Sequence, residues 1–386
     1  MYSKRIVELE PSGTIALGNR VKTMIEQGVD VVSLTLGEPD FDTPRPVREA
    51  AKKGLDEGLT HYMPSLGTME LRKAIAKRVM EHNHLKVDHQ NVMVLPAKMA
   101  IFMAVQALVD PGDEVIVPDP GWVSYCPIVT LAGGRSVPVA MMHGDGWTWD
   151  LEDIEKAMTK RTKAIILNTP SNPTGSMVPL DVQKGIADLA AERDITVISD
   201  EIYENLVYDE PHHSIGSLDG MMDRTITVSG FSKSYAMTGW RIGWMVASKE
   251  TIGMVNKFQE HSLTCLPGFV QKAAVAALQT GDGYVEEMRR EFKGRRDMLI
   301  PKLNEIDGVT CEVPKGAFYA FMRMDTGMSS ARTAEALLND AHVALTPGSA
   351  FGRMGEGYQR MSYAASRKNL EEGIARIAKF MKGLKR

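Results

Sequence analysis

Cysteine is scarce in this sequence, and the few cysteines lie far apart. Three occur among 386 residues, Cys126, Cys265 and Cys311, and no two stand at the spacing of a zinc-binding or redox motif. Neither a disulfide framework nor a cysteine-bound zinc ion is expected, because a framework needs several cysteine pairs and a zinc site needs cysteines at ligand spacing. Such usage is typical of a reducing compartment, and we expect a cytoplasmic protein.

Long hydrophobic runs and a strong charge of one sign are also lacking. The most apolar long segment, residues 99–109, is too short to span a bilayer. The opening residues lack the apolar block of a signal peptide. A net charge of −4 provides no basic surface for nucleic acid or anionic lipid. We therefore expect no nucleic-acid partner and no membrane partner.

The histidines form no recognisable metal motif. His82 and His84 stand two residues apart, and His212 precedes His213, but neither pair has an acidic or cysteine partner at ligand spacing. Structural zinc sites need four such ligands, and catalytic sites need three. The sequence therefore predicts no metal site.

Short apolar segments alternate with helix-like segments through much of the chain, which is long enough for two domains. The strand-like segments are residues 92–95, 114–117, 136–139, 164–167, 196–199, 225–228 and 242–246, and the helix-like segments include 97–109, 123–132, 151–158 and 179–193. This alternation predicts an α/β fold, with a mostly parallel seven-stranded sheet flanked by helices.

The pattern changes near residue 281. A long charged helix is expected at 284–305, strands at 309–313 and 317–323, helices near 330–340 and 367–384, and an N-terminal helix at 14–27 followed by a strand at 31–36. These segments predict a smaller α+β domain made of residues 1–40 plus 281–386. The large domain is expected to comprise residues 41–280.

Candidate site residues follow the expected strands, beyond whose carboxyl ends an open α/β sheet binds its ligands. Ala97 and Lys98 open a helix whose free backbone N–H groups favour an anion. Trp122 follows the next strand on a loop, where its ring can stack on an aromatic ligand. Taken alone, an ordinary turn and a half-buried tryptophan explain these residues equally well.

Two further loops are more specific. Asn172 stands in a turn with two prolines and a glycine, residues 168–175, which restricts its side chain. Asp200 leaves a buried strand, where a carboxylate is costly unless it is paired. It is either a helix cap or the partner of a ligand cation. Tyr203 follows three residues later.

The most informative stretch is residues 230–243, which carries Ser232, Lys233 and Arg241 directly after an apolar strand. A lysine amine that attacks a carbonyl must first lose its proton, which desolvation or a neighbouring cation favours. Arg241 can supply that cation and also bind a phosphate. A surface lysine and a surface arginine are the alternative if the pair is considered alone.

These residues stand in a characteristic order along the chain: Asn172, Asp200, Tyr203, Ser232, Lys233, Arg241 and Arg360. The order resembles the pyridoxal-phosphate-dependent aminotransferases of the aspartate aminotransferase superfamily (fold type I), and most closely their class I branch. The resemblance extends from residues 36–44 to residues 360–364. It implies the cofactor pyridoxal 5′-phosphate and amino transfer between an L-amino acid and a 2-oxo acid.

The resemblance also implies roles around the cofactor ring. Lys233 would form a Schiff base with the cofactor aldehyde and later move a proton at the substrate Cα. Asp200 would keep the pyridine nitrogen protonated, which makes the ring an electron sink. Tyr203 and Asn172 would hydrogen-bond the ring oxygen, and Trp122 would lie on the ring face.

A phosphate site and a shared dimer site are implied in the same way. Arg241, the Ser232 hydroxyl and the N–H groups of Ala97 and Lys98 would hold the phosphate. Tyr62 resembles the tyrosine that reaches the phosphate of a neighbouring subunit. The resemblance therefore implies a homodimer with shared active sites.

The resemblance implies fewer residues for substrate binding than for cofactor binding. Arg360 would bind the α-carboxylate with its planar fork, with help from Gly37, Trp122 and Asn172. The acceptor is expected to be 2-oxoglutarate in a ping-pong mechanism, with aspartate or aromatic amino acids as first candidates for the donor. No second arginine for a side-chain carboxylate is evident.

Other functions stay open. A β-lyase of the cysteine-conjugate type would use the same cofactor and scaffold. A regulator that senses an effector without turnover typically carries an additional DNA-binding segment before this region. A nicotinamide-dependent dehydrogenase needs a GxGxxG fingerprint, but Gly239 and Gly243 have a different spacing and precede a strand.

Overall fold

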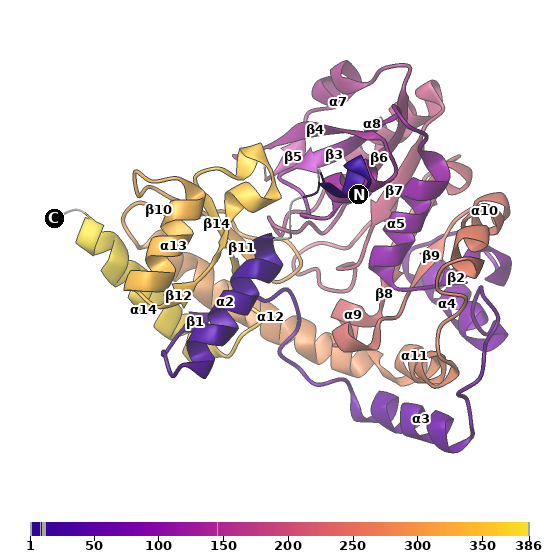
Figure 1. Ribbon diagram of the computed structural model, residues 1–386, viewed down its shortest axis with the longest axis horizontal. Coiled ribbons are helices and arrows are strands. Elements are labelled where there is room, and N and C mark those ends of the chain that lie inside the picture. The colour runs from indigo at the N-terminus through magenta and orange to yellow at the C-terminus, as the bar shows by residue number, and fades with distance from the viewer. Residues whose placement is uncertain (1, 8, 10–12, 145, 385–386) are drawn as a thin grey trace.

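The computed structural model describes residues 2–7, 9, 13–144 and 146–384. Within these residues, eight strands form one sheet, here called the large sheet, in the order β2-β9-β8-β7-β6-β3-β4-β5 (Figure 1). Its strands are β2 (Val92–Val94), β3 (Glu114–Asp119), β4 (Arg135–Met142), β5 (Thr148–Trp149), β6 (Thr162–Asn168), β7 (Thr196–Asp200), β8 (Thr225–Gly230) and β9 (Gly243–Val246).

The large sheet confirms the predicted, mostly parallel arrangement. Strands β4, β3, β6, β7 and β8 pair in parallel, whereas β9 runs antiparallel to both of its neighbours. All seven predicted strands are present. The eighth strand, β5, was not predicted, because its two residues are too few to show a strand periodicity.

Helices cover both faces of the large sheet (Figure 1). The helices of this part of the chain are α3 (Arg45–Asp56), α4 (Met69–His82), α5 (Ala97–Leu108), α6 (Tyr125–Leu131), α7 (Leu151–Ala157), α8 (Leu180–Arg193), α9 (Phe231–Ser234), α10 (Lys249–Glu260) and α11 (Gly268–Thr280). Helix α3 lies apart from the strands and packs on α11. Successive strand residues point to opposite faces. Val115 accordingly joins the core beneath α5 and α6, while Ile116 joins the core beneath α7 and α8.

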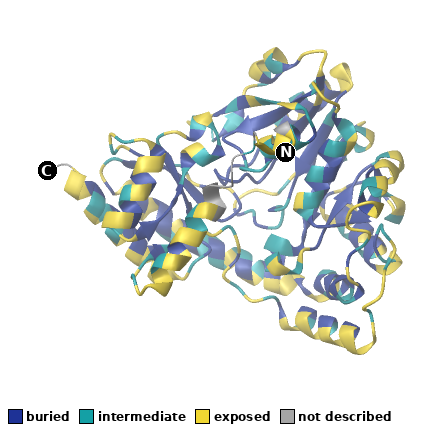
Figure 2. Ribbon diagram, viewed as in Figure 1, coloured by how far each residue is buried: buried dark blue, intermediate teal, exposed yellow. Residues whose placement is uncertain are grey.

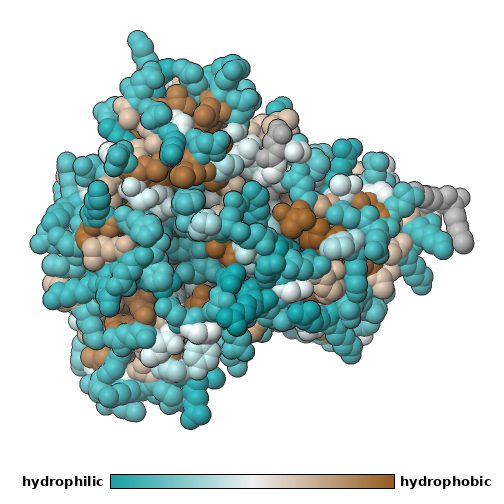
Figure 3. Space-filling view, turned by 180° about the vertical axis from the view of Figure 1, so that it is seen from behind, coloured by the Kyte–Doolittle hydropathy of each residue, from teal (hydrophilic) through white to brown (hydrophobic). Residues whose placement is uncertain are grey.

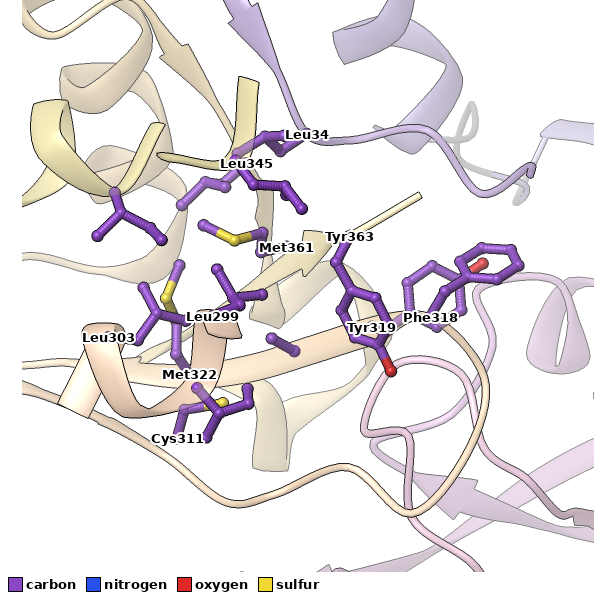
Figure 4. Close-up of a cluster of buried hydrophobic side chains, with 14 of the residues drawn as sticks. Leu34, Leu299, Leu303, Cys311, Phe318, Tyr319, Met322, Leu345, Met361 and Tyr363 are labelled. Carbon is purple, nitrogen blue, oxygen red and sulfur yellow. The ribbon is translucent and has the colours of Figure 1, made fainter. Parts of the chain in front are cut away.

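A second, antiparallel sheet, here called the small sheet, contains four strands in the described part of the chain, in the order β10-β11-β14-β13. They are β10 (Val309–Cys311), β11 (Tyr319–Met324), β14 (Tyr358–Ser362) and β13 (Thr346–Pro347), and the helices beside them are α12 (Asp282–Asn304), α13 (Ser330–Asp340) and α14 (Arg367–Leu384). Leu299, Leu303, Met322 and Met361 form part of the buried core between these elements (Figure 4).

The N-terminal segment contacts both parts of the molecule (Figure 1). Helix α1 (Lys4–Val7) lies beside α6 of the large sheet, where Arg5 donates a hydrogen bond of 3.1 Å to the Leu131 carbonyl oxygen. Helix α2 (Gly13–Glu26) and strand β1 (Val32–Ser33) lie beside the small sheet and its helices, and β1 pairs in parallel with β12 (Val343–Ala344). The strand predicted at 31–36 is therefore much shorter. Leu34 still enters the core, but Leu36 is 54% exposed, because the chain turns away toward the site.

Helix α12 is shared by the two cores. Its Val285 packs in the core beside α4 and α11, whereas Phe292 and Leu299 pack in the core of the small sheet. The predicted domain limits at residues 40 and 280 stay a prediction, and the chain ends at residue 1 and residues 385–386 lie outside the described residues.

The exterior is mostly polar. Buried residues fill the sheets, whereas exposed residues lie on the outer helix faces (Figure 2). One whole face is mainly hydrophilic, with separate small hydrophobic patches (Figure 3). Among the described helices, none combines the length and the apolar character that crossing a bilayer requires.

Candidate active site

A cavity of about 880 Å³ lies at the carboxyl ends of the large-sheet strands and extends to the small sheet. All but one of the predicted site residues line it. These are Gly37, Ala97, Lys98, Trp122, Asn172, Asp200, Tyr203, Ser232, Lys233, Arg241 and Arg360. Tyr62 is the exception: it is 88% exposed and lies outside the cavity.

Strand pairing explains why these residues converge. Asn168 ends β6 and Asp200 ends β7, and the two residues are direct partners in the parallel register. Strand β8 ends at Gly230, where a Cβ atom would lie only 2.7 Å from the Cα of Gly243. Only glycine allows this approach, which leads the chain directly into α9 and Lys233.

Asp200 is buried and strongly hydrogen-bonded. Its carboxylate accepts a hydrogen bond of 2.7 Å from the Tyr125 hydroxyl and one of 3.3 Å from the backbone N–H of Ile202. Burial nevertheless raises the pKa of Asp200 to about 6, because the apolar surroundings disfavour the charge. A positively charged ligand group beside Asp200 would stabilise the carboxylate.

Lys233 faces the same cavity from α9. Its amine is partly buried and donates a hydrogen bond to the carbonyl oxygen of Gly37. Burial lowers the pKa of Lys233 to about 8, and the positive charges of Arg360 and Arg241 act in the same direction. At neutral pH, a larger fraction of this amine is therefore uncharged than in a free lysine.

The start of α5 provides donors for an anion. The helix follows Pro96, and no side chain caps its first turn. The N–H groups of Ala97 and Lys98 therefore belong to the uncapped, positive end of the helix. Burial and the nearby charge of Arg241 lower the pKa of the Lys98 ammonium. A bound anion would relieve the repulsion between these two cations.

Arg360 is a buried cation without a carboxylate partner among its hydrogen bonds. Its guanidinium donates to the Asn172 side-chain oxygen at 2.9 Å and to the Thr35 carbonyl oxygen at 2.8 Å. The Tyr319 and Phe351 rings lie 4.5 and 4.9 Å from it, and its Nε is buried without a partner. A buried charge in such surroundings is costly, so the site favours an anionic ligand.

Two tyrosines of the site were not predicted. Tyr125 bonds Asp200, as described above, and the Tyr319 hydroxyl lies 2.8 Å from the Tyr203 hydroxyl. Both missed residues are buried and line the cavity. In the sequence they fall inside an apolar helix pattern and an apolar strand pattern, so no local signal separates them from core tyrosines.

The histidine prediction needs one correction. His212 has an acidic partner, since its Nε2 lies 2.9 Å from the Glu201 carboxylate. Glu201, Glu204 and His212 have ligand atoms within 4.8 Å of one another. Asn83 donates hydrogen bonds to both of these carboxylates, so the group forms a buried polar network. Sequence spacing missed it because Glu201 and His212 meet only through the fold.

Comparison with known proteins agrees with this geometry. A family model for aminotransferases of class I and II matches residues 29–377. The chain belongs to this family. The aspartate aminotransferase of Pyrococcus abyssi is 47% identical to this aminotransferase over 359 residues, which cover 92% of each chain. The aromatic-amino-acid aminotransferase 2 of Thermococcus litoralis is 44% identical, over 93% of this chain and 94% of that protein.

The fold of this aminotransferase is shared with solved structures. The aspartate aminotransferase of Thermus thermophilus with maleate is 41% identical and has a TM-score of 0.94, over 98% of this chain and 99% of that chain. The alanine aminotransferase of Pyrococcus furiosus has a TM-score of 0.95 at 34% identity, over 99% of this chain and 100% of that chain. The class I, fold type I prediction is therefore confirmed, and the family is one of pyridoxal-phosphate-dependent enzymes.

Proposed function

We propose that this aminotransferase binds pyridoxal 5′-phosphate in the cavity and transfers an amino group from an L-amino acid to 2-oxoglutarate in two ping-pong half-reactions. One observation carries the proposal. A buried carboxylate, a buried guanidinium and an amine of lowered pKa line a single cavity: Asp200, Arg360 and Lys233. These are the groups that a ring cation, a substrate carboxylate and a proton transfer require.

The residues present fit the cofactor. Asp200 forms no ion pair with another side chain in the part of the chain that the structure describes, and a protonated ring nitrogen would provide a cation at this carboxylate. The uncapped start of α5, with Arg241 and Ser232, suits a phosphate. Tyr203 and Asn172 also line the cavity and are assigned to the ring oxygen.

Bound pyridoxal phosphate supplies an aldehyde that takes up the amino group and a ring that stabilises negative charge at the substrate Cα. The chain supplies the rest. Lys233 would hold the cofactor through its amine and would move the proton at the substrate Cα. Its lowered pKa suits both accepting and donating a proton near neutral pH. Arg360 orients the substrate through its carboxylate.

Aspartate and aromatic amino acids are the proposed donors. The aspartate aminotransferase of P. abyssi and the aromatic-amino-acid aminotransferase 2 of T. litoralis support both candidates. The cavity also contains a further cation, Lys98, whose ammonium lies 4.9 Å from the centre of the Trp122 ring. A side-chain carboxylate would pair with Lys98, and an aromatic ring would contact Trp122.

A spectrophotometric screen of half-reactions tests the proposal. The purified protein is loaded with pyridoxal phosphate, and the visible spectrum is followed after each common L-amino acid is added. Conversion to the amine form by aspartate is the expected result, with reversal by 2-oxoglutarate. Failure of every donor would contradict the proposal, and release of pyruvate and ammonia without an acceptor would favour the β-lyase.

Arg360→Lys is expected to lower kcat/KM for amino-acid donors by about 10- to 100-fold, mainly through KM. A lysine keeps the charge but loses the second parallel hydrogen bond to a carboxylate, worth about 1.5–3 kcal/mol. Stopped-flow measurement of the first half-reaction checks this. Arg323→Lys, at an exposed position of β11, serves as the control and should behave like wild type. Equal kcat/KM values for the two variants would show that Arg360 does not bind the substrate carboxylate.

We also propose a homodimer in which Tyr62 reaches the phosphate of the neighbouring subunit. The high exposure of this large aromatic side chain supports a partner surface at Tyr62. The cytoplasmic location stays a prediction, supported by three free cysteines within the described residues.

Sharing of sites predicts complementation between two variant chains that are each impaired alone. A mixture of Tyr62→Phe and Lys233→Ala chains should recover activity, because one site of each heterodimer then has both an intact Tyr62 and an intact Lys233. The assay is run at limiting cofactor, where loss of a hydrogen bond to phosphate lowers affinity by about tenfold or more. A mixture of Lys233→Ala and Asp200→Asn chains is the control, since those groups act in the same chain. No recovery after verified subunit exchange would count against sharing.

A further inference from the structure

A pair of tyrosine hydroxyls links the two sheets at the site. Tyr319 begins β11 of the small sheet, and its hydroxyl oxygen lies 2.8 Å from that of Tyr203, which follows β7 of the large sheet. Both side chains are buried and line the cavity. Their rings meet edge to face, with centroids 5.8 Å apart. The hydroxyl pair is thus a polar bridge between the cofactor side and the substrate side.

The Tyr319 ring and the Tyr319 hydroxyl have different surroundings. The ring lies 4.5 Å from the Arg360 guanidinium. The hydroxyl lies against Gly37, where a Cβ atom would come within 2.9 Å of the oxygen. Removing only the hydroxyl oxygen of Tyr319 would therefore keep the contact between its ring and Arg360, and would remove the hydrogen bond to the Tyr203 hydroxyl.

Counting protons assigns the direction of the hydrogen bond. A tyrosine hydroxyl has one proton and donates one hydrogen bond. If Tyr203 donates its proton to the ring oxygen of the cofactor, the bond between the two hydroxyls requires Tyr319 as the donor. Hydrogen bonds in a chain polarise one another, so a hydroxyl that accepts one bond donates a stronger one.

We infer that Tyr319 is a positioning residue for the cofactor: its hydroxyl donates to Tyr203 and thereby orients and strengthens the hydrogen bond that Tyr203 donates to the cofactor ring oxygen. This inference rests on the proposed function. Tyr319 acts through Tyr203 and not through the substrate carboxylate.

The pH titration of the visible absorption of the cofactor-loaded protein tests the inference. A hydrogen bond to the ring oxygen stabilises its negative charge and favours the deprotonated form of the chromophore. Tyr319→Phe should weaken that bond and raise the titration midpoint by about half a unit to one unit. Tyr203→Phe should raise it further.

The double variant distinguishes an indirect role from an independent one. If Tyr319 acts through Tyr203, then Tyr203→Phe/Tyr319→Phe has the midpoint of Tyr203→Phe alone. Tyr208→Phe is the matched control, because this buried tyrosine bonds the carbonyl of Ala317 and does not line the cavity. Its midpoint should equal that of wild type.

Failure of the inference and failure of the proposed function would give different results. An unchanged midpoint in Tyr319→Phe, with a folded protein by circular dichroism, overturns the inference. So does a shift that persists in the Tyr203→Phe background. A wild-type protein that binds no pyridoxal phosphate and shows no visible absorption contradicts the proposed function instead.

Discussion

Lys233→Ala is expected to lower kcat by at least about 10⁴-fold, the largest effect of any single substitution in this chain. The lysine is assigned two tasks, covalent attachment of the cofactor and movement of the proton at the substrate Cα. Loss of a positioned general acid–base group alone costs about 10²–10⁴-fold. Its partly buried amine, with a pKa lowered to about 8, fits that task near neutral pH.

Two measurements check this result. Single-turnover kinetics with aspartate measures the lost rate, and mass spectrometry after borohydride reduction shows whether the cofactor is attached to the chain. The variant should carry no attached cofactor. Lys156→Ala, on the exposed surface of α7, should match wild type in both measurements. An active Lys233→Ala protein, or attachment at another lysine, would refute the assignment.

Asp200→Asn is expected to lower kcat by about 10²–10³-fold, the size typical of removing one preorganised electrostatic group from an active site. The amide of the variant has no negative charge and would not keep a positive charge on the cofactor ring nitrogen. Tyr125, which donates to Asp200, is retained in the variant. Stopped-flow spectroscopy of the first half-reaction measures the loss directly.

The same substitution should stabilise the protein without cofactor. The pKa of Asp200 is raised from 3.8 to about 6, so the folded state binds the proton more tightly than the unfolded chain. Ionisation therefore costs stability as the pH rises from about 4 to 6, and the full cost of about 3 kcal/mol is present above pH 6. The amide side chain of the variant carries no charge and avoids this cost.

Thermal unfolding of the cofactor-free proteins at pH 5 and pH 8 checks the sign. The gain in melting temperature of Asp200→Asn over wild type should be larger at pH 8. Asp194→Asn, at a highly exposed position, provides the control. A variant that is less stable than wild type at pH 8 would show that the Asp200 charge is already compensated within the chain.

Much of the cavity lining could be predicted from the sequence, for a physical reason. Each strand of a parallel sheet is a short apolar segment, and a polar residue at its carboxyl end, such as Asp200 or Asn168, stands out against it. Strand pairing then brings these ends together. Glycines such as Gly230 mark the close backbone approach beside Lys233.

Other parts of the site depend on contacts that only the folded chain makes. The hydroxyl pair of Tyr203 and Tyr319 joins residues 116 positions apart. The strand predicted at 31–36 ends early because the Thr35 carbonyl accepts a hydrogen bond from Arg360 instead of continuing a sheet. The periodicity of the sequence does not indicate these hydrogen-bond partners, since each of the residues also fits an ordinary buried position.

The hydrogen bond between Thr35 and Arg360 joins residues 325 positions apart. During synthesis it can therefore form only after nearly the whole chain has been translated. Domains emerge from the ribosome and fold from the N-terminal side. Lys233, Asp200 and the phosphate donors are translated well before β14. If Arg360 binds the substrate carboxylate, as proposed, recognition of the amino acid becomes possible only after the residues of the same chain that are assigned to the vitamin cofactor have been made.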